Sequence, residues 1–331
     1  MTAFYYFCGH EQWQPEVLVE HAVAAEEAGF DGVLVSEHFH PWVDDAGASG
    51  YAFSTLGAIA RATGRVRIAT GVITPLFRHH PAVVAQAAAT LDRLSGGRFD
   101  LGLGTGENIN EAPVGFAFPR YAERAGRMGE ALEIIRRLLD GEKVTFEGRY
   151  YRTDRARLYS PPLRRVPIWM AAGGPRSAAL AATAADGVIT SVKDPAESLE
   201  KVLLPARRAA AAAGRPAPHV VATRWVIAAG DQEEAWQALL PWRGLRAPGR
   251  LEAVDPGDLR RRADALPRSE VLSRYTVAPD ADALVAAYRP LVEQVGADVV
   301  TLQVASLRQE ETIALLGAEV LPRLRQLAPA T

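Results

Sequence analysis

The chain has 331 residues, of which 48% are apolar and 23% charged, proportions that are typical of a globular protein. Its net charge of −2 gives no reason to expect a nucleic-acid or membrane-surface partner. The single cysteine, Cys8, excludes an internal disulfide and a thiolate metal cluster, so we expect no metal site. We find no secretory signal and no apolar run long enough to span a bilayer, and we expect a cytoplasmic protein.

Segments typical of strands and of helices alternate along almost the whole chain. Short apolar runs indicate buried strands, while proline at the start of a helix and glycine just beyond its end mark the helices. The first four strand–helix pairs are expected at residues 3–8 and 15–28, 32–38 and 51–63, 66–73 and 81–94, and 99–104 and 121–139.

The alternation is interrupted twice. Within residues 144–158, the stretch Phe146–Tyr151 indicates a small hairpin that turns at Glu147 and Gly148. Residues 236–272 contain Pro, Gly and many Arg, and we expect them to be irregular. The remaining pairs are expected at residues 166–171 and 175–184, 187–192 and 196–213, 219–228 and 280–295, and 298–304 and 309–327.

Eight strand–helix pairs predict a single (β/α)8 TIM barrel, because each parallel strand needs a crossover helix and eight strands close the sheet. We expect one domain over residues 1–331, with insertions near 144–165 and 240–275. A doubly wound open sheet is the alternative. It is disfavoured because the first strand is followed by Gly9-His10-Glu11, which carries no glycine fingerprint for a dinucleotide.

The stretch Gly32–Trp42 begins as a buried strand and changes abruptly into Ser36, Glu37, His38, Phe39 and His40. An acid, two imidazoles and an indole gathered at a strand's carboxyl end are typical of an active site, since barrel enzymes place their sites there. A polar loop with one core-facing histidine would be the simpler interpretation, but the clustering of these residue types favours a site.

Polar or glycine-rich residues also follow the other expected strands. They include Glu11, Thr74, Gly104–Glu111, Ala171–Gly174 and Thr190–Lys193. Gly173 and Gly174 precede the helix expected at residues 175–184. They could present backbone N–H groups to an anion, although a tight turn would also use glycine. The glycines of Gly104–Glu111 would allow a flat ligand to approach the backbone closely.

Three of these motifs, Ser36–Trp42, Gly104–Glu111 and Ala171–Pro175, resemble the luciferase-like flavin and deazaflavin oxidoreductases. Gly71–Pro75 and Pro81–Gln86 agree with the branch that uses coenzyme F420, the branch of the F420-dependent glucose-6-phosphate dehydrogenases. The resemblance runs nearly end to end, with its best register before about residue 195. It implies a luciferase-like barrel that binds F420.

The resemblance also implies roles for individual residues. His38 would take the substrate's hydroxyl proton, Glu107 would protonate the reduced ring, and Trp42 and Glu11 would line the substrate side. Glu37 stands where the family usually has Asp, and a cis peptide is implied at Gly71–Val72. The cofactor-binding positions implied are Glu37, Gly71, Val72, Thr74, Thr105, Gly106, Glu107, Asn110, Ala172, Gly173 and Gly174.

For the substrate, the resemblance implies a phosphate held by Thr190, Lys193, Arg250 and Arg274, with Ser191 as an alternative to Thr190. Arginine can hold such a dianion bidentately. A solvated Arg-rich insertion would explain the same arginines without a ligand. Leu251 departs from the family, since the glucose-6-phosphate enzyme has an active-site histidine there, and this weakens the hexose assignment.

We therefore expect an F420-dependent dehydrogenase that oxidises a sugar 6-phosphate at its anomeric hydroxyl. An F420-dependent alcohol or hydroxy-lipid dehydrogenase, an FMN monooxygenase and a non-catalytic barrel are the alternatives. A base and an acid at strand ends disfavour the last, because storing a cofactor requires neither. The resemblance suggests a homodimer.

Overall fold

The computed structural model describes residues 1–328, and its centre is a closed barrel of eight parallel strands. Most residues of these strands are buried, and β2 and β4 are buried along their whole length, as expected for apolar runs covered by helices. The barrel strands are β1 (Ala3–Cys8), β2 (Gly32–Val35), β3 (Arg67–Thr70), β4 (Phe99–Leu103), β7 (Ile168–Ala171), β8 (Gly187–Ser191), β9 (His219–Ala228) and β11 (Val299–Ala305).

The sheet closes because β8 pairs with β9, starting at Gly187 opposite His219, while β11 joins β9 to β1. A short extra strand, β10 (Thr276–Ala278), adds to β9 in parallel. The predicted (β/α)8 barrel is thus confirmed, although β10 was not expected. Strand β3 ends at Thr70, earlier than predicted, and the peptide bond between Gly71 and Val72 is cis.

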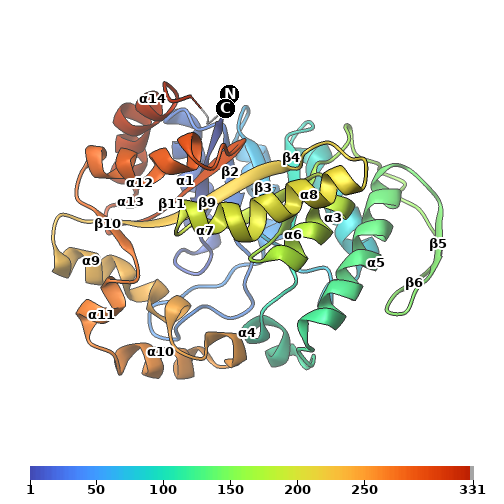
Figure 1. The fold of residues 1–331 in the computed structure, drawn as a ribbon, viewed down its shortest axis with the longest axis horizontal. Helices are drawn as coiled ribbons and strands as arrows, with labels where there is room; N and C mark the ends of the chain where they lie inside the picture. The colour runs from blue at the N-terminus through green and yellow to red at the C-terminus, as the bar shows by residue number, and fades with distance from the viewer. Residues whose placement is uncertain (329–331) are drawn as a thin grey trace.

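Helices surround the barrel (Figure 1) and bury their apolar faces against the outer side of the strands. This packing forms the largest part of the core, and Leu18, Leu56 and Ile135 are fully buried in it. The helices are α1 (Pro15–Glu27), α2 (Ala52–Ala62), α3 (Pro81–Leu94), α5 (Tyr121–Leu139), α6 (Pro175–Ala184), α7 (Pro195–Ser198), α8 (Leu204–Ala212), α12 (Ala281–Glu293), α13 (Gln309–Leu315) and α14 (Leu321–Leu324).

The first insertion is the predicted hairpin, formed by β5 (Val144–Glu147) and β6 (Arg152–Ala156), and it projects from the side of the barrel in Figure 1. Glu147 pairs with Arg152, so the connection spans residues 148–151. It is longer than the tight turn expected at Glu147 and Gly148, because three backbone N–H groups of this loop donate to Glu130 on α5 instead.

The second insertion is helical, so the expectation of an irregular segment was wrong. Asp231 and Asp255 cap helix starts, and the Leu259 side chain is fully buried. The prolines separate short helices here instead of preventing them. The elements are α9 (Gln232–Leu239), a 3₁₀ segment at Leu240–Arg246, a 3₁₀ turn at Arg250–Glu252, α10 (Pro256–Asp264) and α11 (Arg268–Leu272).

This insertion lies over the carboxyl ends of the strands, where α4 (Asn108–Glu111), α10 and α11 share one edge of the molecule in Figure 1. An apolar cluster joins the two parts, because Trp242 of the insertion packs near Trp225 of β9 and Trp42 after β2. At the other end of the barrel, Asp100 accepts hydrogen bonds from Tyr5 and Arg67. The open end is therefore the one beneath the insertion.

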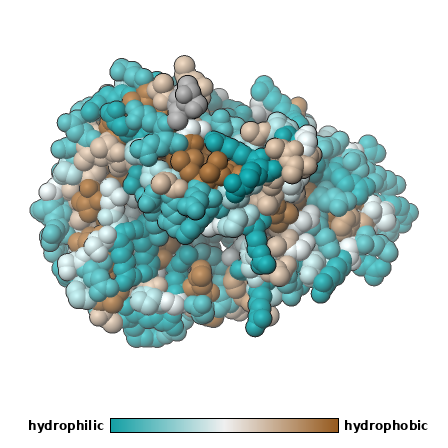
Figure 2. Space-filling view, in the orientation of Figure 1, coloured by the Kyte–Doolittle hydropathy of each residue, from teal (hydrophilic) through white to brown (hydrophobic). Residues whose placement is uncertain are grey.

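The face seen in Figure 2 is predominantly hydrophilic, with hydrophobic side chains in small separate groups. Within residues 1–328, no helix is long and apolar enough to cross a membrane.

Candidate active site

A cavity of about 1110 Å³ opens at the carboxyl ends of the barrel strands. Ligand pockets are usually roughly 300–1,000 Å³ in volume, so this one has room for a cofactor together with a substrate. Every residue to which the sequence analysis gave a catalytic, cofactor-binding or phosphate-binding role lines the cavity, except Gly174, which precedes the first residue of α6. Phe39 and His40 of the Ser36–Trp42 motif do not line it. The predicted residues are therefore brought together, although their individual roles are a separate question.

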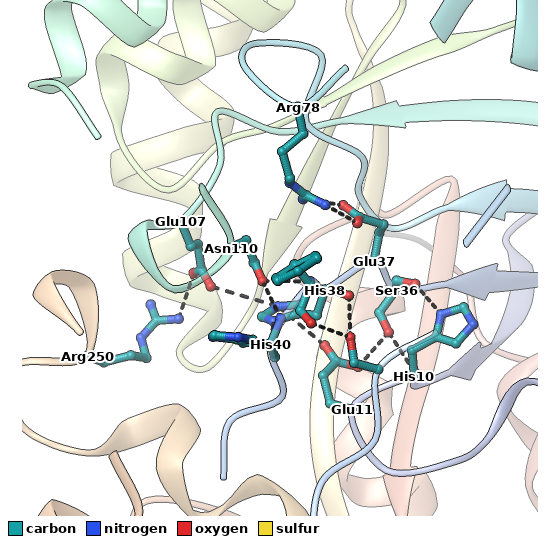
Figure 3. Close-up of polar contacts among 12 residues, drawn as sticks. His10, Glu11, Ser36, Glu37, His38, His40, Arg78, Glu107, Asn110 and Arg250 are labelled. Atoms are coloured by element: carbon teal, nitrogen blue, oxygen red, sulfur yellow. Dashed lines mark hydrogen bonds and ion pairs between the residues drawn. The ribbon is translucent and has the colours of Figure 1, made fainter. Parts of the chain in front are cut away.

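His38 lies in the wall of this cavity, and Figure 3 shows it among its polar neighbours, which include Glu11 and Glu107. Its Nδ1 is 2.9 Å from the backbone carbonyl oxygen of His40, and since a carbonyl can only accept, Nδ1 carries the hydrogen. The other nitrogen, Nε2, lies 3.5 Å from Glu11 Oε1 and 3.9 Å from Glu107 Oε2. Nε2 is therefore the basic atom, and it is placed between two carboxylates.

Glu11 is held by a chain of buried polar groups that leads away from the cavity. Ser36 donates its hydroxyl to Glu11 Oε2 at 2.5 Å and accepts the backbone N–H of His10 at 2.9 Å. His10 Nδ1 lies 2.6 Å from the Ser36 carbonyl oxygen, and its Nε2 lies 2.8 Å from the Thr55 hydroxyl. Burial lowers the pKa of His10, so the ring is neutral and the chain orients Glu11 without adding charge.

Glu37 forms a two-point ion pair with Arg78, with N–O distances of 2.7 and 2.8 Å. The same guanidinium reaches Glu111 at 3.3 Å through Nε. The burial of Glu111 raises the pKa of its carboxyl, while Arg78 acts in the opposite direction. One arginine thus compensates two buried acids at the rim of the cavity and fixes the Glu37 carboxylate in place.

Glu107 meets Arg250 at 2.8 Å through Oε1, and the Arg250 guanidinium lies 5.2 Å from the Trp42 ring centre. The second oxygen, Oε2, is buried without a hydrogen-bond partner among the described residues. The indole nitrogen of Trp42 is also buried and has no hydrogen-bond partner among the described residues. Arg250, predicted as a phosphate ligand, is therefore engaged with the predicted acid, and Glu107 and Trp42 each keep one unpaired atom, as do Tyr121 and Trp225 in the same cavity wall.

Asn110 has a positioning contact as well as a place in the cavity wall. Its side-chain oxygen accepts the backbone N–H of Phe39 at 2.9 Å and that of His40 at 3.3 Å. It therefore holds the loop whose carbonyl fixes the His38 tautomer.

The walls formed by β3, β4 and β7 carry glycine at positions where a side chain would clash or would fill the cavity. A Cβ at Gly71 would lie 2.3 Å from Leu34, and a Cβ at Gly104 would lie 2.5 Å from Val72. A Cβ at Gly173 would meet no atom within 4 Å, so glycine leaves open space ahead of α6. These walls fit a flat ring whose anionic tail approaches a helix start.

The opposite end of the cavity is basic. Lys193, Arg246, Arg250 and Arg274 all line it, together with Thr190 and Ser191. Thr190 is 4% exposed, whereas Ser191 is exposed, and both remain candidates for the hydroxyl ligand. Arg274 is engaged with Glu270 at 2.7 Å and with the carbonyl oxygen of Arg246 at 2.6 Å.

The sequence model of the luciferase-like monooxygenases matches residues 3–298 of this chain. The chain belongs to the luciferase-like monooxygenase family. This family member is 40% identical over 329 residues to the F420-dependent glucose-6-phosphate dehydrogenase of Nakamurella multipartita, with 98% of this chain and 97% of that protein covered. It is also 40% identical over 273 residues to the F420-dependent hydroxymycolic acid dehydrogenase of Mycobacterium tuberculosis, covering 82% of this chain and 74% of that one.

Among solved structures, an F420-dependent secondary alcohol dehydrogenase in complex with an F420–acetone adduct superposes with a TM-score of 0.92. It is 31% identical and the match covers 98% of this luciferase-like chain and 99% of that one. The tetrahydromethanopterin reductase of Methanopyrus kandleri, at 22% identity and a TM-score of 0.80, shares the fold.

Three residues at or behind the site of this luciferase-like protein were not predicted from the sequence, namely Arg78, His10 and Arg246. His10 and Arg78 follow strands β1 and β3, so the sequence could place them near the strand ends. It could not show which residues they contact. Arg246 stood in the segment expected to be irregular. Within residues 1–328, no group of three or more His, Cys, Asp or Glu side chains is arranged to hold a metal ion.

Proposed function

We propose that this protein is an F420-dependent dehydrogenase that oxidises a sugar 6-phosphate at its anomeric hydroxyl. The observation that carries the proposal is His38, whose Nε2 faces Glu11 and Glu107 in a cavity with one flat end and one basic end. Glucose-6-phosphate dehydrogenases that use F420 are relatives of 40% and 38% identity over nearly the whole chain.

The residues present fit the cofactor. When bound, F420 supplies a deazaflavin ring that accepts a hydride. Gly71, Val72, Thr74 and the loop Thr105–Glu107 would face that ring, and Glu37, fixed by Arg78, would meet its polar head group. Ala172 and the glycines before α6 would receive the anionic tail.

The chain's own residues account for the proton movements. His38 takes the hydroxyl proton at Nε2, and the nearby Glu11 carboxylate stabilises the imidazolium that results. Glu107 Oε2, the atom left unpaired in the cavity, is the atom that would exchange a proton on the cofactor side. Trp42 packs on His38, with ring centres 4.6 Å apart, and limits the imidazole's movement.

The proposal is tested by mixing the purified protein with F420 and a panel of alcohols, and following the loss of the cofactor's absorbance. Glucose 6-phosphate and mannose 6-phosphate are compared with glucose and 2-propanol. We expect turnover with at least one phosphorylated sugar and a much higher KM for glucose. Turnover of 2-propanol with none of any sugar phosphate would reject the proposal.

The second candidate is an F420-dependent alcohol or hydroxy-lipid dehydrogenase. It is favoured by the TM-score of 0.92 to a secondary alcohol dehydrogenase and by the exposed Leu251, which follows Arg250 in the chain. The same panel separates the two candidates. An FMN monooxygenase is tested by titrating the protein with FMN and F420 separately, and tight binding of FMN alone would favour it.

We also propose a cytoplasmic homodimer that takes no nucleic-acid partner. Its single cysteine is buried and free, as suits a reducing compartment. Light scattering should give twice the 35.7 kDa mass of one chain. A monomer mass at micromolar concentration would contradict the dimer.

A further inference from the structure

A small annex of about 170 Å³ adjoins the basic end of the main cavity and shares Ser191, Lys193, Arg246 and Arg274 with it. It has room for about six water molecules, since each occupies about 30 Å³ in the liquid, and therefore for one phosphate group. Four basic side chains line the annex, with Arg224 as the fourth, and none of its described lining residues is acidic.

Three of these four cations have no carboxylate partner in the part of the chain that is described. Arg224 donates to two backbone carbonyl oxygens, of Ala287 at 2.8 Å and of Lys193 at 3.2 Å. Lys193 and Arg246 form no ion pair within residues 1–328. Like charges held together without counter-charges repel one another, so an anion would stabilise the arrangement.

Arg246 is held in this place from two sides. Its guanidinium lies 4.1 Å from the ring centre of Tyr275, and its carbonyl oxygen accepts a hydrogen bond from Arg274 at 2.6 Å. Burial lowers the pKa of Arg246, and Arg250 and Arg274 act in the same direction. A half-buried, pre-oriented guanidinium differs from the exposed Arg261 and Arg262 of the same insertion.

We propose that Arg246, together with Lys193, binds the substrate's phosphate in this annex, and that Arg274 acts as a positioning residue for Arg246. Arg250, in contrast, is occupied by Glu107 on the catalytic side. The inference rests on the proposed function, because it names the group that the substrate's phosphate meets. It keeps Lys193 and adds Arg246, a residue outside the four that the sequence implied.

Two experiments test it. In the first, inorganic phosphate is titrated calorimetrically into the protein without substrate. Arg246→Gln should weaken phosphate binding roughly 10- to 100-fold, the loss expected when a charged hydrogen-bond donor is removed. Arg246→Lys should recover part of it. Arg208→Gln, at an exposed position on α8, is the matched control and should bind phosphate as the unmodified protein does.

In the second, steady-state kinetics with glucose 6-phosphate should show KM raised by a similar factor in Arg246→Gln, with kcat changed less than about threefold. Arg274→Gln should raise KM in the same way, and the double variant should add little to either single one. Unchanged phosphate binding and unchanged KM in Arg246→Gln would overturn the inference. If Arg246→Gln loses phosphate binding but no sugar phosphate is oxidised by the unmodified protein, the phosphate site at Arg246 stands, whereas the proposed function and the sugar phosphate as its ligand fall.

Discussion

At the scale of single residues, His38, the proposed base, has one ring nitrogen, Nε2, that is free to accept a proton. The hydrogen bond from Nδ1 to the His40 carbonyl fixes the tautomer, and Asn110 fixes that carbonyl's loop. The base is thus prepared by backbone geometry before any ligand arrives, which lowers the cost of orienting it during the reaction.

The first prediction concerns this base. His38→Ala should lower kcat by about 10²–10⁴, the range for loss of a general base, with little change in F420 affinity. His40→Ala is the matched control, because it removes a neighbouring imidazole that does not line the cavity while keeping the backbone carbonyl that His38 needs. Near-normal kcat in His38→Ala would transfer the role to Glu11 or Glu107.

Arg78 is the second residue on which the site depends. Arg78→Gln would leave Glu37 and Glu111 buried without their cation, which should lower the free energy of unfolding by about 3–5 kcal/mol and weaken F420 binding. Adding Glu37→Gln should restore part of the stability. Denaturant unfolding measures both variants, and a loss below about 0.5 kcal/mol in Arg78→Gln would show that water replaces the pair.

At the scale of elements, helix α1 carries a buried histidine that the reaction does not use. His21 is 2% exposed and packs edge-on against Tyr6 of β1 and Trp13, with ring centres 6.3 and 5.2 Å away. Burial lowers the pKa of His21 to about 4, and its Nδ1 has no partner among the described residues.

This histidine makes the α1–β1 packing sensitive to acid. Between about pH 6.5 and pH 4 the unfolded chain binds a proton at this residue and the folded protein does not, so stability falls as the pH is lowered through that window. His21→Leu should remove the effect. At pH 5 the variant should retain about 2 kcal/mol more of its neutral-pH stability than the unmodified protein, as measured by urea unfolding. Parallel pH profiles for the two proteins would contradict this.

At the scale of the whole molecule, we propose that the barrel and its second insertion fold as one unit. Trp242 is 3% exposed, lies near Phe7 and Trp225 of the barrel, and donates its indole N–H to Gln12. Trp242→Ala should cost about 3–5 kcal/mol, the range for truncating a buried aromatic side chain, within a single unfolding transition. Separate transitions seen by near- and far-ultraviolet circular dichroism would indicate two units.

The barrel and the residue types at the open end of its strands could be predicted, because both depend on short stretches of neighbouring residues. An apolar run followed at once by Glu37 and His38 specifies a strand and what lies at its end. The partners could not be predicted, since Arg78 meets Glu37 and Arg250 meets Glu107 across 41 and 143 residues of chain. The helices of the second insertion were missed because they are short and separated by prolines, so no long periodic pattern marks them.

The proposed reaction is a direct hydride transfer from the anomeric carbon of a sugar phosphate to F420. It can be followed with glucose 6-phosphate that carries deuterium at carbon 1, by mass spectrometry of the cofactor after one turnover. We expect the reduced cofactor to carry one deuterium and His38→Ala to slow its appearance. Reduced cofactor without deuterium, or no reduction while 2-propanol is oxidised readily, would contradict it.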